Sequence, residues 1–207
     1  MLVCKQRGSY LLFRYLHDIM TAIEGLMAFL LLSNAVLGAI PAHATVSAMP
    51  ISPSYAVAIT AYNAVPAQTD SEPLVTASGA YSNPEVVAAR SQDLASELPF
   101  GTVIEFVGSP KRNDSCGYDI VAPIIGYRVI ADTMNVRYKD RIDILFSTKS
   151  NYLMADGSTK NASTILGVCS DALIRVVGHI DLTHPSRLPK TQEDLAALVS
   201  GNPLALK

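Results

Sequence analysis

Residues 131–146 read ADTMNVRYKDRIDILF, and the end of this stretch decides the fold that we expect. Its last six residues have the composition of a buried β-strand with one acidic residue inside it. Successive side chains of a strand point to opposite faces, so Asp143 points away from the face that Ile142 and Ile144 share. If the isoleucines face the core, the carboxylate must be solvated, paired with a residue such as Arg141, or functional.

Five other short runs along the chain are also rich in Val and Ile and bounded by Gly, Pro, Asp or Ser. The six expected strands are 55–62, 86–90, 102–107, 127–131, 141–146 and 173–180. No strong amphipathic helix separates them, apart from a turn or two near 161–166. This spacing favours a small β-barrel or sandwich over a βαβ fold.

The segments outside these strands are expected to be loops and a tail. The inserts 109–125 and 148–160 are predicted to be surface loops. Near the C-terminus, Thr191 opens a sequence of capping-box type and is followed by apolar residues at helical spacing. We therefore predict a short C-terminal helix that docks on the barrel.

The first 44 residues are predicted to be a cleaved signal peptide. A basic start is followed by an apolar run over 25–39 and by the sequence PAHA at 41–44, which fits the small-x-small pattern of signal peptidase sites. The apolar run has about 15 residues, short of the about 20 that a spanning helix needs. An uncleaved anchor is the alternative, and Met20 is a second possible start.

Cleavage would give an exported protein of the periplasm or cell surface, with no lasting membrane insertion. The expected organisation is a signal peptide over 1–44, a linker over 45–54, a barrel domain over 55–182 and a tail with a short helix over 183–207.

Composition and cysteine usage narrow the class of protein further. The formal net charge is −2, so the chain has no polybasic footprint for nucleic acid. It contains no CxxC, HExxH or phosphate-binding glycine loop, and we predict neither a metal nor a cofactor. Cleavage of the signal peptide would remove Cys4, and Cys116 and Cys169 would remain in the mature protein. An even pair in an exported chain favours a disulfide, with two free thiols in a core as the alternative.

Residues 59–146 resemble the three-aspartate (3D) domain, a family related to membrane-bound lytic transglycosylase A and the stationary-phase survival proteins. Five motifs occur in the family's order: TAY at 60–62, TASG at 76–79, VAA to Asp at 87–93, LPFGT at 98–102 and DT to RID at 132–143. The resemblance implies a mainly β fold, a six-stranded double-psi β-barrel with short helices and a C-terminal helix. Met134 stands where the family has glycine.

The resemblance also implies an activity on the glycan strands of peptidoglycan. Its members cleave the bond between N-acetylmuramic acid and N-acetylglucosamine and leave a 1,6-anhydro ring. The implied catalytic residues are Asp143 as acid and base, Asp132 as the supporting carboxylate and Asp93 as the third. We expect a monomer, and enzymatic cleavage is the interpretation we favour.

The proposed substrate-positioning donors are Tyr62, Thr76 and Ser78. Two alternatives stay open at this point. The barrel can bind peptidoglycan or another glycan without cleaving it, or the aspartates can form a structural cluster that caps turns and pairs with arginines 128, 137 or 141.

Overall fold

The computed structural model describes residues 52–108, 110 and 116–201. The expected signal peptide at 1–44 lies outside the described residues, as does all of the expected linker before residue 52. Among the helices of the described ranges, none is both long and apolar enough to cross a membrane.

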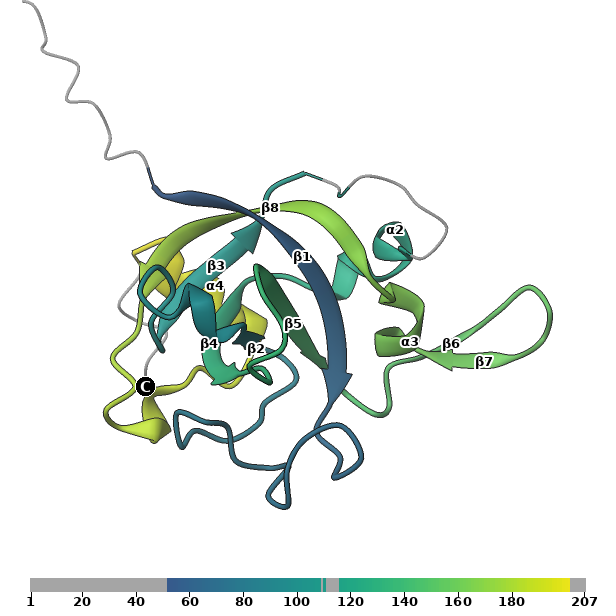
Figure 1. The fold of residues 1–207 in the computed structure, drawn as a ribbon, viewed down its shortest axis with the longest axis horizontal. Coiled ribbons are helices and arrows are strands. Elements are labelled where there is room, and N and C mark those ends of the chain that lie inside the picture. The colour runs from purple at the N-terminus through teal and green to yellow at the C-terminus, as the bar shows by residue number, and fades with distance from the viewer. Residues whose placement is uncertain (1–51, 109, 111–115, 202–207) are drawn as a thin grey trace, which may run out of the picture. The chain divides into compact units, whose positions relative to one another are not determined.

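Six strands close into a barrel (Figure 1). They are β1 (Ser54–Asn63), β2 (Val87–Arg90), β3 (Thr102–Phe106), β4 (Arg128–Thr133), β5 (Arg141–Phe146) and β8 (Cys169–His179). Their order around the barrel is β1-β5-β2-β4-β3-β8. The pairs β1–β5 and β2–β4 are parallel and the other pairs are antiparallel. The predicted mainly β fold with six barrel strands is confirmed, and the mixed barrel is compatible with a double-psi arrangement.

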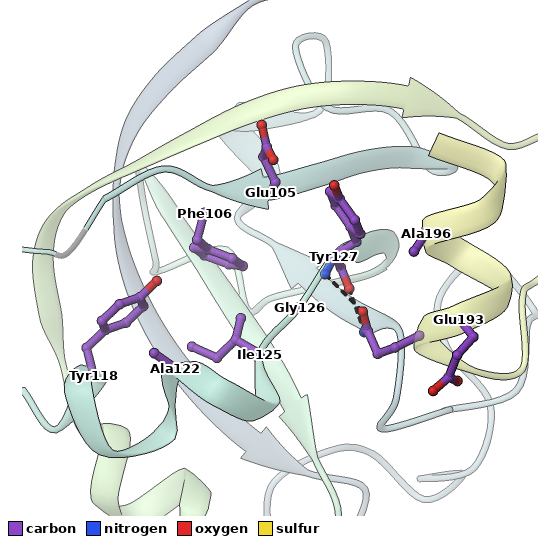
Figure 2. A pocket seen from close by; sticks show the side chains of 10 residues that line it. Glu105, Phe106, Tyr118, Ala122, Ile125, Gly126, Tyr127, Glu193 and Ala196 are labelled. Atoms are coloured by element: carbon purple, nitrogen blue, oxygen red, sulfur yellow. Dashed lines mark hydrogen bonds between the residues drawn. The ribbon is translucent and has the colours of Figure 1, made fainter. Parts of the chain in front are cut away.

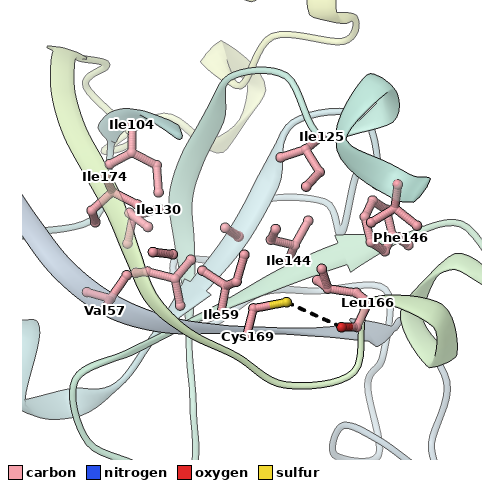
Figure 3. Packing of buried hydrophobic residues seen from close by; sticks show 14 of the residues in the cluster. Val57, Ile59, Ile104, Ile125, Ile130, Ile144, Phe146, Leu166, Cys169 and Ile174 are labelled. Carbon is pink, nitrogen blue, oxygen red and sulfur yellow. Dashed lines mark hydrogen bonds between the residues drawn. The ribbon is translucent and has the colours of Figure 1, made fainter. Parts of the chain in front are cut away.

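The barrel is filled by aliphatic side chains that alternate along its strands (Figure 3). Ile142 and Ile144 are both 0% exposed, so the alternation expected for β5 is confirmed. Neighbouring strands contribute β-branched residues to the same cluster, among them Val57, Ile59, Ile104, Ile130 and Ile174. Burying each such side chain contributes about 1.5–3 kcal/mol, so the interior supplies a large share of the stability.

The C-terminal segment packs against the outside of the barrel, as predicted. Helix α4 (Gln192–Val199) begins after Thr191, whose Oγ1 accepts a hydrogen bond from the backbone N–H of Asp194 at 3.1 Å. Leu188 and Leu195 are buried in an apolar cluster with residues of β2, β3 and β4. The tail over 183–201 therefore contributes to this apolar cluster on the outside of the barrel.

The expected surface loops contain short elements of their own. The insert 148–160 was predicted to be a loop, but it forms most of a hairpin of β6 (Asn151–Leu153) and β7 (Thr159–Asn161). The other insert ends in α2 (Tyr118–Val121) and the 3-10 turn η2 (Ala122–Ile124). The turn expected near 161–166 is α3 (Ala162–Leu166). Two further 3-10 turns are η1 (Gln92–Leu94) and η3 (Pro185–Arg187).

The guanidinium group of Arg128 lies inside the fold and binds backbone carbonyls. Arg128 is 1% exposed, and its Nε donates to the carbonyl of Ile125 at 2.7 Å. Its Nη1 donates to the carbonyls of Pro84 (2.7 Å) and Leu145 (3.2 Å), and its Nη2 to that of Ile124 (3.0 Å). Burial lowers the pKa of Arg128 to about 10, which leaves the side chain charged at neutral pH.

The predicted disulfide is present between Cys116 and Cys169, 53 residues apart. It ties the segment before α2 to the first residue of β8, and Cys169 is fully buried in the core (Figure 3). Gly167 pairs with Cys116 in an isolated β-bridge, so the disulfide also fixes the chain just before β8.

Removing this disulfide should destabilise the protein by about 2–4 kcal/mol, because closing a loop of this size restricts the unfolded chain. We expect the double variant Cys116→Ser, Cys169→Ser to unfold at a lower urea concentration than the wild type. Reduced wild-type protein is the matched comparison and should unfold at the same urea midpoint as the double variant. Equal midpoints for the double variant and the wild type would show that the cross-link adds no stability.

Candidate functional site

A row of four residues crosses the strands β1, β5, β2 and β4. Thr60 pairs with Asp143, Asp143 with Ala89, and Ala89 with Asp132. Side chains of directly paired residues lie on the same face of a sheet. The two aspartates therefore share one face, with Cα atoms about two strand spacings, or about 10 Å, apart. Ala89 lies between them in the row.

A β-bulge in β4 gives Asp132 this orientation. Ala88 of β2 pairs with Ile130, but the next residue, Ala89, pairs with Asp132, so Ala131 is an extra residue in β4. Ile130 is buried in the barrel interior. With strict alternation Asp132 would share the interior face of Ile130, and the extra residue turns it to the outside instead.

An open groove of about 990 Å³ lies over this row. Its walls come from β1, β4 and β5, the loop 67–77, the turn 134–138 and the segment 163–168. This volume is at the upper end of what small-molecule sites in proteins have. Asp132 and Asp143 both line it, so the structure brings these two predicted site residues together.

Asp143 lies half-buried in the groove and is only partly hydrogen-bonded. Its Oδ1 accepts a hydrogen bond from the hydroxyl of Thr60 at 2.8 Å. Within the described residues, Oδ2 has no hydrogen-bond partner. Burial raises the pKa of Asp143 to about 6; the Thr60 hydrogen bond and the charge of Arg141 oppose this rise, and the charge of Asp132 adds to it. A substantial fraction of this carboxyl group is therefore protonated near pH 6.

Asp132 is held by three donors. Its Oδ2 accepts from the Tyr62 hydroxyl at 2.9 Å, and its Oδ1 accepts from the backbone N–H groups of Ala77 (3.0 Å) and Thr133 (2.9 Å). Burial and then the charge of Asp132 raise the pKa of Tyr62 well above its usual value of 10.0. Tyr62 therefore keeps its proton and stays a donor to the carboxylate.

The TASG turn at 76–79 positions Asp132. Besides the Ala77 bond, the N–H of Ser78 donates at 3.0 Å to the carbonyl of Ala131, the extra residue of the bulge. Gly79 has φ +83°, a backbone conformation that favours glycine. Thr76 is buried and lines the groove, and its hydroxyl donates to the carbonyl of Ala80 at 3.0 Å. Of the three expected substrate-positioning donors, Tyr62 and Thr76 line the groove and Ser78 does not.

The third aspartate of the motif, Asp93, does not line this groove. It is exposed, and its Oδ2 accepts a hydrogen bond from the backbone N–H of Asp140 at 2.9 Å. Ser91 accepts from the N–H of Arg141 at 3.0 Å, so both side chains hold the turn that precedes β5. The geometry corrects the expectation of a three-aspartate cluster, because Asp93 fixes a turn, and of the three motif aspartates Asp132 and Asp143 line the groove.

The arginines near the groove do not neutralise its aspartates. Among the described residues, no arginine forms an ion pair with Asp132 or Asp143. Arg128 is committed to carbonyl groups, and Arg137 and Arg141 lie over the ring of Tyr138, with Cζ atoms 4.8 and 5.0 Å from its centre. The alternative of a structural aspartate–arginine cluster therefore lacks its contacts. Sequence reasoning missed Arg141 as a groove residue, although its two-residue spacing from Asp143 places it on the same face of β5.

A second, smaller hollow of about 530 Å³ lies beside α4 (Figure 2). Phe106, Tyr118 and Tyr127 line it together with Ala196. Gln192 ties the helix to the barrel there, since its side chain accepts from the N–H of Tyr127 at 3.0 Å and donates to its carbonyl at 2.9 Å. This hollow has no pair of neighbouring, partly buried acids, so the larger groove is the candidate functional site.

Fold and site together define a closed six-stranded β-barrel whose open groove holds two neighbouring aspartates. No protein-family model and no curated protein matches the sequence. The chemistry of the groove is therefore the basis on which a function can be proposed.

The raised pKa of Asp143 has a consequence for stability. A carboxyl that holds its proton more tightly when folded than when unfolded contributes most below the unfolded pKa of about 4, and the contribution is lost as pH rises through about 6. Asp143→Asn removes the buried charge, so above pH 7 it should be more stable than the wild type by about 1–2 kcal/mol, with no gain at pH 4. Urea unfolding at the two pH values measures this difference.

Asp70→Asn is the control for that comparison, because Asp70 lines the same groove but is exposed. Asparagine can keep the 2.9 Å bond that Asp70 accepts from the N–H of Glu72. We expect its stability to stay within about 0.5 kcal/mol of the wild type at both pH values. An equal gain for Asp143→Asn at pH 4 and pH 8 would rule out a buried titrating carboxyl as the cause.

Proposed function

We propose that this protein is a 3D-type barrel that cleaves peptidoglycan glycan strands as a lytic transglycosylase. The observation that carries the proposal is the half-buried Asp143, with its pKa raised to about 6, in an open groove beside a second carboxylate. The order of the five sequence motifs supports the same family. An exported location agrees with the disulfide, since such bonds persist mainly in oxidising compartments.

The reaction needs one carboxyl group that acts first as an acid and then as a base. Protonated Asp143 gives its proton to the glycosidic oxygen, the bond from that oxygen to C1 of N-acetylmuramic acid breaks, and positive charge develops at C1. The Asp143 carboxylate then takes the proton of the sugar's own C6 hydroxyl, whose oxygen bonds to C1. The product is a 1,6-anhydro sugar, and neither water nor an enzyme nucleophile is consumed. Ordinary glycosidases instead need a second carboxylate as a base or nucleophile.

Asp132 supplies negative charge near the developing cation. Three hydrogen-bond donors hold the Asp132 carboxylate in place, and one of them is the hydroxyl of Tyr62, a residue of β1. Preorganised charge of this kind stabilises a transition state without reorganisation during the reaction. Ala89, which pairs with both aspartates, is buried in the apolar cluster that also includes Tyr62.

The direct test is digestion of purified sacculi by the purified protein, with mass spectrometry of the soluble muropeptides. We expect products that end in 1,6-anhydro-N-acetylmuramic acid and a rate that falls as pH rises above about 6, because Asp143 must be protonated to act. Products with ordinary reducing ends would indicate hydrolysis instead. Heat-denatured protein is the blank.

A non-catalytic glycan-binding barrel is the second candidate, and one observation favours it. Met134 stands where the 3D family has glycine and lines the groove, and its side chain is largely buried in an apolar cluster with Tyr62 and Leu188. The segment next to Asp132 therefore departs from the family's pattern at the groove. This function predicts that the protein sediments with sacculi and that neither it nor Met134→Gly releases soluble product.

A further inference from the structure

One end of the groove is basic. Arg141 lies two residues before Asp143 on the same face of β5, and Arg137 belongs to the turn before this strand. Both guanidinium groups lie over the ring of Tyr138, and Nη2 of Arg137 donates to the Tyr138 hydroxyl at 2.8 Å. The ring thus holds two positive charges together at the edge of the candidate site.

These arginines have donors that the protein itself does not use. Within the described residues, Nε of Arg141 is buried and has no hydrogen-bond partner. A buried N–H without an acceptor costs about 1–3 kcal/mol, so such a group marks a place where an acceptor is expected. No carboxylate of the described residues forms an ion pair with either arginine. A guanidinium with free donors is the side chain best suited to a planar carboxylate.

We propose that Arg141 and Arg137 bind a carboxylate carried by a sugar of the substrate, next to the bond that Asp143 cleaves. The proposal rests on the function proposed above and names the substrate class: a glycan whose muramic acid carries a free lactyl carboxylate. Where that carboxylate is joined to a peptide it becomes an amide, which has no charge and offers one acceptor oxygen in place of two.

The charged groups around this subsite are compatible with a bound anion. Asp143 lies on the same face of β5 as Arg141, whereas Asp132 lies two strands further on and is held by its own donors. Asp70 and Glu72 line the opposite wall and are exposed, so solvent screens them. Arg141 lowers the pKa of Asp143, and a bound carboxylate would offset that charge. An acidic sugar would therefore help to keep the proton on Asp143 before the reaction.

The test compares two muramic acid-containing tetrasaccharides that differ only in the lactyl group, which is a free acid in one and a methylamide in the other. Their affinities for the Asp143→Asn protein, which should not turn over, are measured by calorimetry in low salt. We expect the acid to bind about tenfold more tightly than the amide, as for one charge-assisted hydrogen-bonded pair. The added variant Arg141→Gln should reduce this preference to less than about twofold.

Two further variants keep the test decisive. Arg137→Gln changes an exposed side chain and should lower the acid preference to about threefold even if the Arg141 variant does not fold. Arg175→Gln removes an exposed arginine that pairs with Glu105 outside the groove and should leave the preference at about tenfold. Equal binding of acid and amide, or no binding of either at millimolar concentration, would overturn the subsite.

The subsite and the proposed activity can fail separately. Release of anhydro products from sacculi together with equal binding of acid and amide would leave the lytic activity standing and remove the subsite. A tenfold acid preference without any released product would keep the subsite and favour the non-catalytic glycan-binding barrel.

Discussion

Asp143→Asn should lower the release of 1,6-anhydro products by about a thousandfold, because general acid–base catalysis by one positioned group contributes about 10²–10⁴. Asparagine preserves the size of the side chain and can still accept the hydrogen bond from Thr60. It cannot deliver a proton to a glycosidic oxygen or remove one from a hydroxyl. The initial rate of soluble muropeptide release at pH 6 measures the loss.

Two other Asp→Asn exchanges calibrate this result. Asp156→Asn lies in the turn between β6 and β7, outside the groove, and should leave the rate unchanged. Asp93→Asn tests the original three-aspartate hypothesis, and we expect less than a tenfold loss because Asp93 only fixes the turn before β5. If Asp143→Asn keeps more than a tenth of the wild-type rate, Asp143 is not the acid.

Arg128→Met should destabilise the protein by about 3–5 kcal/mol, the largest stability effect that we expect from one substitution. Methionine fills part of the volume but leaves the carbonyls of Pro84, Ile124 and Ile125 without their donor in the buried interior. The strand β4, which carries Asp132, begins at this residue. Urea unfolding followed by circular dichroism gives the difference in the free energy of unfolding.

Arg175→Met is the matched control for this variant. Arg175 is exposed and pairs with Glu105 on the surface, so its loss should cost less than about 1 kcal/mol. A cost for Arg128→Met as small as that of the control would mean that the carbonyl groups find other donors or water.

The barrel could be predicted because its signal is local. Each of the six runs of β-branched residues corresponds to a strand, and the alternation around Asp143 gave the correct face of β5. The C-terminal helix followed from its cap at Thr191. The hairpin of β6 and β7 was missed because its strands are short and polar, so their sequence lacks the pattern of a half-buried strand.

The site was only half predictable, because its geometry depends on pairings between distant strands. Motif matching named Asp93 as the third aspartate of the site, and the contacts separate this turn-fixing residue from the groove residues. The use of Arg128 as a donor to five carbonyls depends on segments that meet only in the folded chain. Ala89 pairs with both aspartates, and an alanine in a strand gives no sequence signal of that position.

The extra residue at position 131 makes the site depend on the number of residues in β4. An exchange of side chains in this strand would not have the same effect. Deleting Ala131 would remove the bulge, so that Asp132 followed Ile130 directly and still faced outward opposite Ala89, but the carbonyl that accepts the hydrogen bond from the N–H of Ser78 would be lost from the chain. Homologues that keep this contact should therefore keep the extra residue of β4, and because Ala131 is fully buried we expect a small side chain there.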